Sequence, residues 1–218
     1  MSETTIKQVH IFGAGIAGLA AAVYCHKKGY NIKIYEATNY AGGRCRSFHD
    51  PRLDCIIDNG NHLILGGNFN IFEYLNIVGA EKKLLGVKNA FPFIDLQNGE
   101  EWTLRPGKSK FPLWIFLPGR RVPGTSILDY FTIKKFQKKT TDSPLANDLN
   151  ITSNMFKRFW EPLCNAVLNT ESKEGSLKLL INALDLTLLR GPRFSQPFLT
   201  PEGLSATFID PAIDYLVK

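Results

Sequence analysis

The apolar and polar positions at the start of the chain mark three elements in succession. The short apolar run 8–12 predicts a buried strand, and the alanine-rich run 19–28 predicts a helix that stops at Gly29. Residues 31–36 form a second apolar stretch, which predicts another strand. The three elements together make a βαβ unit.

The rest of the pattern predicts a hairpin followed by helices. A strand that runs into a glycine turn is expected within 52–65. Residues 91–104 alternate in polarity and carry Asn98-Gly99, a strong signal for a hairpin between two antiparallel strands. Helices are expected over 71–78, 126–139, 152–169, 174–189 and 206–217.

Composition excludes several classes of protein. The 218 residues are 44% hydrophobic, enough for one large domain or two small ones. Apolar stretches fall well short of the roughly 20 residues that cross a bilayer, and the first ten residues lack the pattern of a signal peptide. The four cysteines form no CxxC pair or zinc-like cluster, so we expect reduced thiols, no metal site and a cytoplasmic protein.

The segment 13–18, Gly-Ala-Gly-Ile-Ala-Gly, lies between the first strand and the helix. In such a GxGxxG loop Gly13 permits the tight turn, Gly15 lets the backbone approach a pyrophosphate, and Gly18 lets helix and strand pack closely. Glu36 ends the second strand, where a carboxylate accepts hydrogen bonds from a ribose diol and repels a 2′-phosphate. The predicted dinucleotide-binding residues are Gly13, Ala14, Gly15, Ile16, Ala17, Gly18, Glu36 and Ala37.

A second glycine motif, Gly42-Gly43-Arg44, follows Glu36 at a fixed spacing. It resembles the E-x(5)-GGR fingerprint of the amine oxidase and carotenoid desaturase superfamily of flavoproteins. The resemblance implies that the paired glycines return the backbone to the diphosphate and that Arg44 neutralises charge nearby. Two small residues do allow close approach, and a guanidinium suits a phosphate. The cofactor implied is FAD rather than NAD.

Two longer segments narrow the resemblance to one family. Residues 58–66, Asp-Asn-Gly-Asn-His-Leu-Ile-Leu-Gly, resemble the D-N-G-Q-H-L-L-L-G motif of the squalene-associated FAD-dependent desaturases, or hydroxysqualene dehydroxylases. Residues 159–170, Phe-Trp-Glu-Pro-Leu-Cys-Asn-Ala-Val-Leu-Asn-Thr, look like the family's W-E-P-L-C-x-A-x-L-N-T motif. Residues 191–212 are more loosely similar to its L-x-P-R…F-P-x-P-A segment. The resemblance therefore spans nearly the whole chain.

This sequence departs from the family pattern at three points. Asn61 stands where the family has glutamine, which shortens the reach of the amide, and residues 108–150 match poorly. The family also continues beyond the counterpart of Lys218, into further strands and a glycine-rich segment that contacts the flavin. The chain is therefore expected to be an N-terminal portion of such an enzyme, from a split gene, an interrupted gene or a fragment.

The fold implied is of the α/β class. It comprises a Rossmann-like, FAD-binding βαβ start and an inserted, mixed but mostly helical substrate domain, with the C-terminal part of the FAD domain missing. The expected boundaries are 1–66 for the N-terminal part of the FAD domain, 67–200 for the substrate-binding region, and 201–218 for the start of the return to the FAD domain.

The activity implied by the resemblance is FAD-dependent, reductive removal of the hydroxyl group of hydroxysqualene to give squalene, in hopanoid biosynthesis. Reduced flavin would deliver the hydride, while the protein supplies an apolar tunnel for the C30 isoprenoid and a proton for the departing hydroxyl. The alternatives are another amine oxidase or carotenoid desaturase-like oxidoreductase, and a non-catalytic fragment.

Two residues are candidates for the proton donor. His62 follows the strand expected beneath the flavin, although a histidine beside a glycine turn often caps that turn. Glu161 lies between Trp160 and Pro162, an apolar setting that favours a protonated acid; its plainer interpretation is a helix-capping carboxylate. The remaining predicted cofactor-binding residues are Gly42, Gly43, Arg44, Asn59, Gly60 and Asn61.

The net charge of +6 suits nucleic acid, anionic lipid or a diphosphate and by itself separates none of them. The motifs favour the diphosphate, and no nucleic-acid partner is expected. Residues 111–117, Arg120, Arg121 and the lysines of 134–139 form either a core face with a solvated lysine end or a peripheral contact with the inner face of the membrane. A C-terminal complementing segment is the remaining expected partner.

Overall fold

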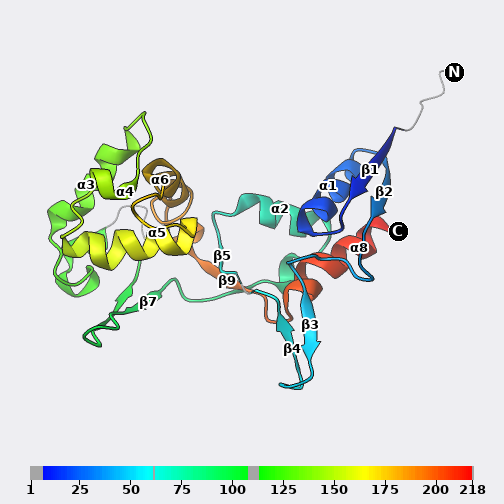
Figure 1. Ribbon diagram of the computed structural model, residues 1–218, viewed down its shortest axis with the longest axis horizontal. Helices are drawn as coiled ribbons and strands as arrows, with labels where there is room; N and C mark the ends of the chain where they lie inside the picture. Colours follow the sequence, from blue (N-terminus) through cyan, green and yellow to red (C-terminus); the bar gives the residue numbers. More distant parts are fainter. Residues whose placement is uncertain (1–6, 61, 108–112, 218) are drawn as a thin grey trace. The chain divides into compact units, whose positions relative to one another are not determined.

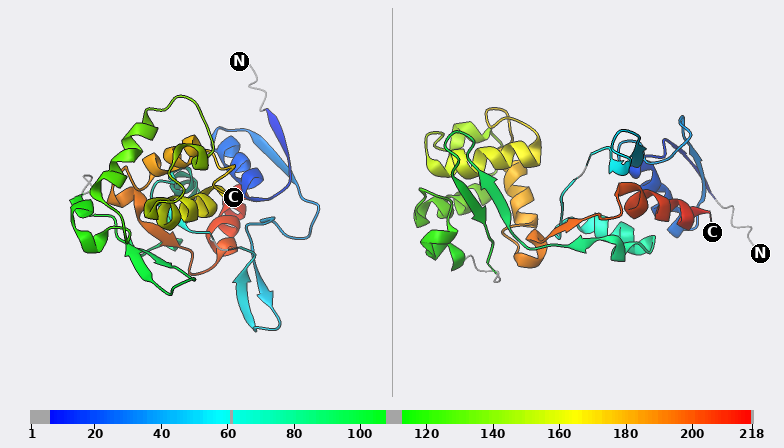
Figure 2. Two further views of the ribbon diagram at one scale, coloured as in Figure 1. Left: turned by 60° about the vertical axis from the view of Figure 1, so that its left-hand side comes forward. Right: turned by 90° about the horizontal axis from the view of Figure 1, so that it is seen from below.

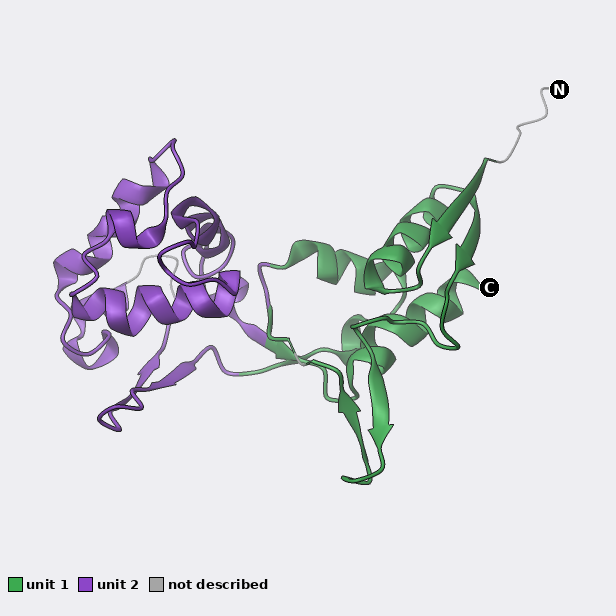
Figure 3. Ribbon diagram, viewed as in Figure 1, with its two compact units in different colours: residues 1–64, 68–87, 198–218 green, residues 65–67, 88–197 purple. Residues whose placement is uncertain are grey.

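The computed structural model describes residues 7–60, 62–107 and 113–217 (Figure 1). Residues 7–60, 62–64, 68–87 and 198–217 form one compact unit, and residues 65–67, 88–107 and 113–197 form the other (Figure 3). Residues 68–87 were expected in the second domain but cluster with the first, because Tyr74 and Leu75 are buried in its core. The last twenty or so residues return to the first unit.

The first unit begins with the expected βαβ arrangement. Strand β1 (Gln8–Phe12) and strand β2 (Asn31–Tyr35) pair in parallel on either side of helix α1 (Ile16–Lys27) in the sequence. The helix ends as predicted, with Gly29 at φ +82°. The inward positions of both strands face α1, whose side chains Leu19 and Val23 are fully buried.

The other face of the β1–β2 pair is exposed. His10, Phe12 and Tyr35 lie on it, and the side chain of Phe12 is 82% exposed. The ring of Tyr35 stacks on Phe12 at 5.0 Å and on His10 at 5.7 Å between centroids, and its hydroxyl lies 2.9 Å from His10 Nδ1. Parallel sheets are normally covered on both faces. The described residues cover only one face of this sheet.

The remaining strands of the first unit were mostly not foreseen. The predicted strand within 52–65 is β4 (Cys55–Asp58), and it pairs with an unpredicted antiparallel neighbour, β3 (Ser47–Asp50). The helix predicted at 71–78 is α2 (Phe69–Ile77), and the short helix η1 (Glu81–Lys83) follows it. A small sheet has the order β5-β9-β6, with bounds Ile64–Leu65, Pro197–Leu199 and Leu85–Gly86.

The C-terminal residues pack against the start of the chain. The π-helix η5 (Ser205–Ile209) and helix α8 (Asp210–Leu216) lie beside α1, far from them in sequence (Figures 1 and 2). Asp58 secures this return, because its Oδ1 accepts a hydrogen bond of 2.8 Å from the Leu204 N–H and one of 2.6 Å from the Ser47 hydroxyl. The core of the first unit is therefore built from both ends of the sequence.

The second unit contains the predicted hairpin and a group of helices. Strands β7 (Phe91–Ile94) and β8 (Glu101–Leu104) pair antiparallel, with Gly99 at φ +73° in the turn. The helices are η2 (Leu113–Phe116), η3 (Pro118–Arg120), α3 (Ile127–Gln137), α4 (Leu145–Asp148), the π-helix η4 (Phe156–Trp160), α5 (Glu161–Leu168), α6 (Leu177–Leu186) and α7 (Pro192–Ser195). No helix in the described parts of the chain is long and apolar enough to cross a bilayer.

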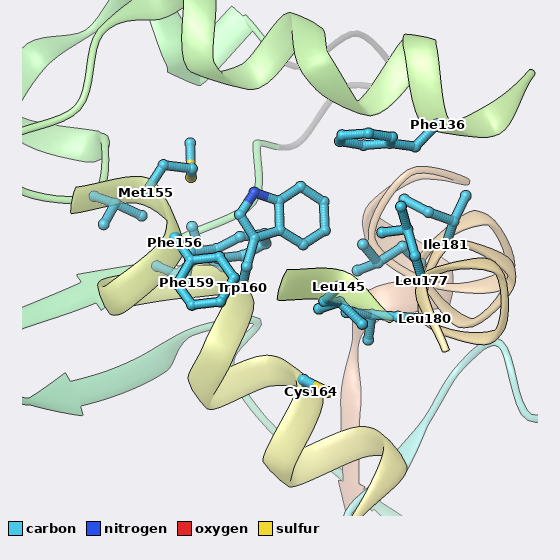
Figure 4. Packing of buried hydrophobic residues seen from close by; sticks show 13 residues of the cluster. Phe136, Leu145, Met155, Phe156, Phe159, Trp160, Cys164, Leu177, Leu180 and Ile181 are labelled. Carbon is cyan, nitrogen blue, oxygen red and sulfur yellow. The ribbon is translucent and has the colours of Figure 1, made fainter. Parts of the chain in front are cut away.

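The core of the second unit centres on Trp160, whose side chain is 1% exposed (Figure 4). Its ring meets Phe159 and Phe136 edge to face, at 5.2 and 6.4 Å between centroids. Cys164 is fully buried one turn further, and a Cβ added at Gly175 would lie 2.3 Å from its sulfur. Three residues of the segment 159–170, which carries much of the family resemblance, are thus part of this core: Phe159, Trp160 and Cys164.

Candidate functional site

The glycine loop has the geometry that a dinucleotide fingerprint requires. Gly13 adopts φ +96°, and its N–H donates to the carbonyl of Tyr35 at 2.7 Å. Helix α1 begins directly after Gly15, whose carbonyl accepts from the Leu19 N–H at 2.9 Å. A Cβ on Gly18 would lie 2.0 Å from the Gly13 carbonyl oxygen and 3.4 Å from the Ile11 side chain. Gly18 therefore lets the helix approach the loop itself as well as the strand.

The second glycine motif lies directly against this loop. The Gly42 N–H donates to the Ala14 carbonyl at 2.8 Å, and Gly15 and Gly42 form an isolated parallel bridge. Gly43, at φ +57°, is so near that a Cβ there would lie 3.4 Å from the Gly15 Cα. The two motifs, separated in sequence, together form one narrow backbone surface.

Glu36 links the end of β2 to the loop. Its Oε2 accepts from the Ala14 N–H at 2.7 Å, and its Oε1 accepts from the N–H and the hydroxyl of Thr38, both at 3.0 Å. The Ala14 N–H, followed by the two groups of Thr38, holds the pKa of the Glu36 carboxyl below its usual value. The side chain is exposed, so a ribose hydroxyl can reach its oxygens.

Two arginines of the Gly42–Arg46 stretch differ in their surroundings. Arg44 is exposed and forms no ion pair with the described residues. The guanidinium of Arg46 instead lies 4.2 Å from the ring centroid of Tyr40 and 5.6 Å from that of Phe48. Arg44 is thus the more exposed of the two, and its guanidinium is accessible to an anion. The stack on Arg46 was not predicted, although the spacing Tyr40, Arg46, Phe48 offered a signal for it.

Asn59 holds the motif at 58–66 against the same stretch. Its side-chain amide donates to the carbonyl of Arg44 at 3.2 Å, and its backbone N–H donates to the carbonyl of Arg46 at 2.9 Å. Gly60 follows in the turn, and the predicted Asn61 lies outside the described residues. Asn59 therefore positions the arginine segment, a role in addition to the predicted contact with a cofactor.

The arrangement suits a diphosphate. The first turn of α1 carries no acidic side chain, and its N–H groups, which include those of Ile16, Ala17 and Gly18, follow Gly15, which lies against Gly42 and Gly43. Free N–H groups and the helix dipole favour an anion at a helix N-terminus. Among the predicted residues, Ala37 is exposed just after β2. The residues present thus fit the diphosphate and ribose of a dinucleotide.

The two candidate proton donors belong to different units. His62 is exposed after β4 in the first unit. Glu161 starts helix α5 in the second unit, is partly buried, and accepts a hydrogen bond of 3.1 Å from the Ser172 hydroxyl. That bond ties the segment after α5 to its first turn, which favours a structural contribution of Glu161. The catalytic assignment of both residues stays a prediction.

Comparison with known proteins gives three consistent results. The family described as NAD(P)-binding Rossmann-like domain matches residues 11–78. Hydroxysqualene dehydroxylase of Sinorhizobium fredii is 39% identical over 213 residues, covering 97% of this chain and 51% of that protein. The enzyme of the same name from Rhodopseudomonas palustris is 40% identical over 211 residues, covering 96% of this chain and 50% of that protein. The chain is thus similar over nearly its whole length to hydroxysqualene dehydroxylases.

The chain spans about half the length of the curated hydroxysqualene dehydroxylases it matches, which fits the N-terminal portion expected from the sequence. A crystal structure of a putative protoporphyrinogen oxidase from Exiguobacterium shares the fold, with a TM-score of 0.60 at 19% identity, over 99% of this chain and 51% of that one. The expected α/β fold with a Rossmann-like start is confirmed.

Proposed function

We propose that this chain binds FAD and forms part of an enzyme that reductively removes the hydroxyl group of hydroxysqualene, giving squalene in hopanoid biosynthesis. The observation that carries the proposal is the 39–40% identity to two hydroxysqualene dehydroxylases over nearly the whole chain. Zeta-carotene desaturase from Solanum lycopersicum is similar over only 88 residues, 40% of this chain. A carotenoid desaturase-like reaction is therefore the second candidate.

The residues of the first unit would hold the adenine dinucleotide end of the cofactor. The N–H groups at the start of α1 and the guanidinium of Arg44 would bind the diphosphate, and Glu36 would accept from the ribose. Gly15 and Gly43 leave room for it, since neither carries a side chain. When bound, FAD supplies the hydride chemistry of the reaction.

The second unit would serve as the substrate region, with apolar side chains for a C30 isoprenoid. The proton for the departing hydroxyl would come from His62 or Glu161. Of the two, Glu161 already has a partner in Ser172, whereas His62 is exposed. His62 is therefore the first choice as donor or orienting group.

A complementing segment is part of the proposal. The exposed face of the β1–β2 pair and the half-length match to the relatives support it. This segment would correspond to the other half of a relative, carried in the same polypeptide or in a second one. A cytoplasmic location with peripheral contact to the inner face of the membrane completes the proposal, since a C30 polyene dissolves in lipid.

The chain co-expressed with the second half of the Sinorhizobium fredii enzyme is expected to hold FAD non-covalently and to convert hydroxysqualene to squalene under a chemical reductant. Acid precipitation should leave yellow FAD in the supernatant, because the GxGxxG and GGR contacts are not covalent. Chromatography of the supernatant and of the lipid extract measures both results. Flavin in the pellet or release as FMN would contradict the cofactor assignment, and absence of squalene from a flavin-loaded complex would contradict the reaction.

Glu36→Ala in the same complex is expected to weaken FAD binding by about tenfold or more, because a charged acceptor is lost from both ribose and loop. Glu36→Gln should have a smaller effect. Flavin fluorescence quenching gives the dissociation constant. The folded protein holds the pKa of the Glu36 carboxyl below its ordinary value of 4.5. The contribution of this carboxylate to stability is therefore fully present above pH 4.5, and it is lost as the pH falls through the lowered pKa.

The matched control is Glu101→Ala, which removes an exposed carboxylate from β8 in the second unit. It should leave the dissociation constant unchanged. An equal effect of both substitutions, or none at Glu36, would remove Glu36 from the site.

A further inference from the structure

Helix α3 presents an outward face that combines apolar and basic side chains. Leu128 is 76% exposed and Phe131 45% exposed, and Lys135 and Lys138 continue the same face at helical spacing. Lys134 joins it, because its Nζ lies 5.6 Å from the centroid of the Phe131 ring. The opposite face of α3 is part of the core of the second unit through Tyr130, Ile133 and Phe136. Burial within the unit therefore leaves this outward face unused.

The neighbouring helices η2 and η3 add similar side chains. Leu113, Phe116 and Leu117 are 63, 55 and 51% exposed, and Arg120 is exposed beyond them. The adjoining residues Trp114 and Ile115 point inward: Trp114 meets Tyr130 of α3 edge to face at 5.4 Å, and Ile115 is buried. Helix η2 is thus packed against α3. We name the exposed residues of α3, η2 and η3 together the α3–η2 surface.

The lysines of this surface, Lys134, Lys135 and Lys138, make no direct salt bridge within the described residues. Lys139 is the main cause of the lowered pKa of the Asp148 carboxyl, and Lys135 is near enough to that carboxyl to help lower its pKa. The nearby Asp129 is engaged with the Ser126 N–H and hydroxyl. Lys139, which the sequence placed with the other lysines, does not belong to the surface, because its ammonium binds both carboxylate oxygens of Asp148 at 2.6 Å.

We propose that the α3–η2 surface docks on an anionic lipid bilayer. Exposed Leu and Phe side chains can enter the boundary between headgroups and acyl chains while lysines meet lipid phosphates. Protein–protein interfaces are depleted in lysine, so the composition of this surface fits a lipid layer better than a protein partner. This surface would make the peripheral membrane contact proposed above. Only the reason for that contact, access to a lipid-soluble substrate, rests on the proposed function.

The test is flotation of the full chain, and of its complex with the complementing half, with vesicles in a sucrose gradient. Vesicle-bound protein rises in the gradient and aggregated protein sinks, so aggregation is not mistaken for binding. The protein is expected to bind vesicles that contain phosphatidylglycerol. Its affinity for vesicles of phosphatidylcholine alone should be lower by about tenfold or more. The double variant Lys135→Glu/Lys138→Glu and the double variant Leu128→Ser/Phe131→Ser should each lose most of the binding.

Matched controls are Lys27→Glu/Lys28→Glu at the end of α1 and Leu96→Ser in the β7–β8 turn, since these side chains are equally exposed but lie outside the surface. They should float like the unchanged chain. Loss of binding in the controls as well, or no flotation of the unchanged chain, overturns the proposal. A chain that floats while its complex does not would assign the surface to the other half of the enzyme and also overturn it. The measurement needs neither flavin nor substrate, so the proposed reaction stands or falls separately.

Discussion

The 218-residue chain purified by itself is expected to be nearly colourless, to associate, and to form no squalene. The predicted site residues suit the diphosphate and the ribose of the cofactor. The isoalloxazine ring needs further protein contacts, which we expect from the complementing segment. The β1–β2 pair also exposes Phe12, His10 and Tyr35 on one face. A whole domain is stable by only about 5–15 kcal/mol, so an uncovered sheet face matters and invites association.

Three measurements check this expectation: bound flavin by absorbance, solution size by light scattering, and squalene formation under a chemical reductant. Co-expression with the second half of a relative should give a complex that holds flavin, is monodisperse and forms squalene. A monodisperse, stoichiometrically yellow chain that forms squalene without any further segment would show the expectation to be wrong. It would also show that the residues present suffice to hold the whole cofactor.

Gly18→Ala is expected to disable the dinucleotide site. The added methyl group would lie 2.0 Å from the Gly13 carbonyl oxygen, which is closer than any non-bonded contact allows. The loop must therefore move away from α1. Overpacking of this kind lowers the free energy of unfolding by about 1–3 kcal/mol, and FAD affinity should fall by about tenfold or more.

Thermal unfolding and a flavin titration of the complemented enzyme measure the two effects. Gly119→Ala is the matched control, because an added Cβ there meets nothing within 4 Å and the backbone is not left-handed. It should change neither quantity. If Gly18→Ala binds FAD like the unchanged enzyme, the close approach of loop and helix is not required for the site.

The sequence predicted well the elements whose causes are local. The βαβ unit, the Asn98-Gly99 hairpin and the main helices follow from periodicity and from glycines at fixed places. The glycine loop was predicted with a reason for each glycine, and the positive φ of Gly13 and the crowding at Gly18 agree with those reasons.

The features that the sequence did not predict depend on distant residues. The small sheet β5-β9-β6 joins strands from three separate parts of the chain, and each strand is too short to show a pattern. The bond from the Ala14 N–H to Glu36 and the placement of residues 68–87 in the first unit have the same origin. Lys139 illustrates the point on the surface, because only the folded chain brings Asp148 to it.

The segment 159–170 shows why a family motif need not mark a catalytic site. Trp160 fills the core, Cys164 packs against Gly175, and Asn169 ends α5 in the left-handed conformation. Close packing constrains Trp160 and Cys164, and backbone geometry constrains Asn169, so the resemblance to the family motif says little about chemistry. The roles of His62 and Glu161 therefore depend on the experiments above.

The discontinuous core of the first unit has a consequence for synthesis on the ribosome. Leu19, Val23 and Leu75 pack with Leu204, Phe208 and Ile209, which are translated only after the whole of residues 88–197. At about 5–20 residues per second, the early half of this core waits on the order of 5–20 s for its partners. The intervening unit, apart from its short 65–67 segment, is continuous and can fold first. The nascent βαβ unit is then a natural client for chaperones that shield apolar surface.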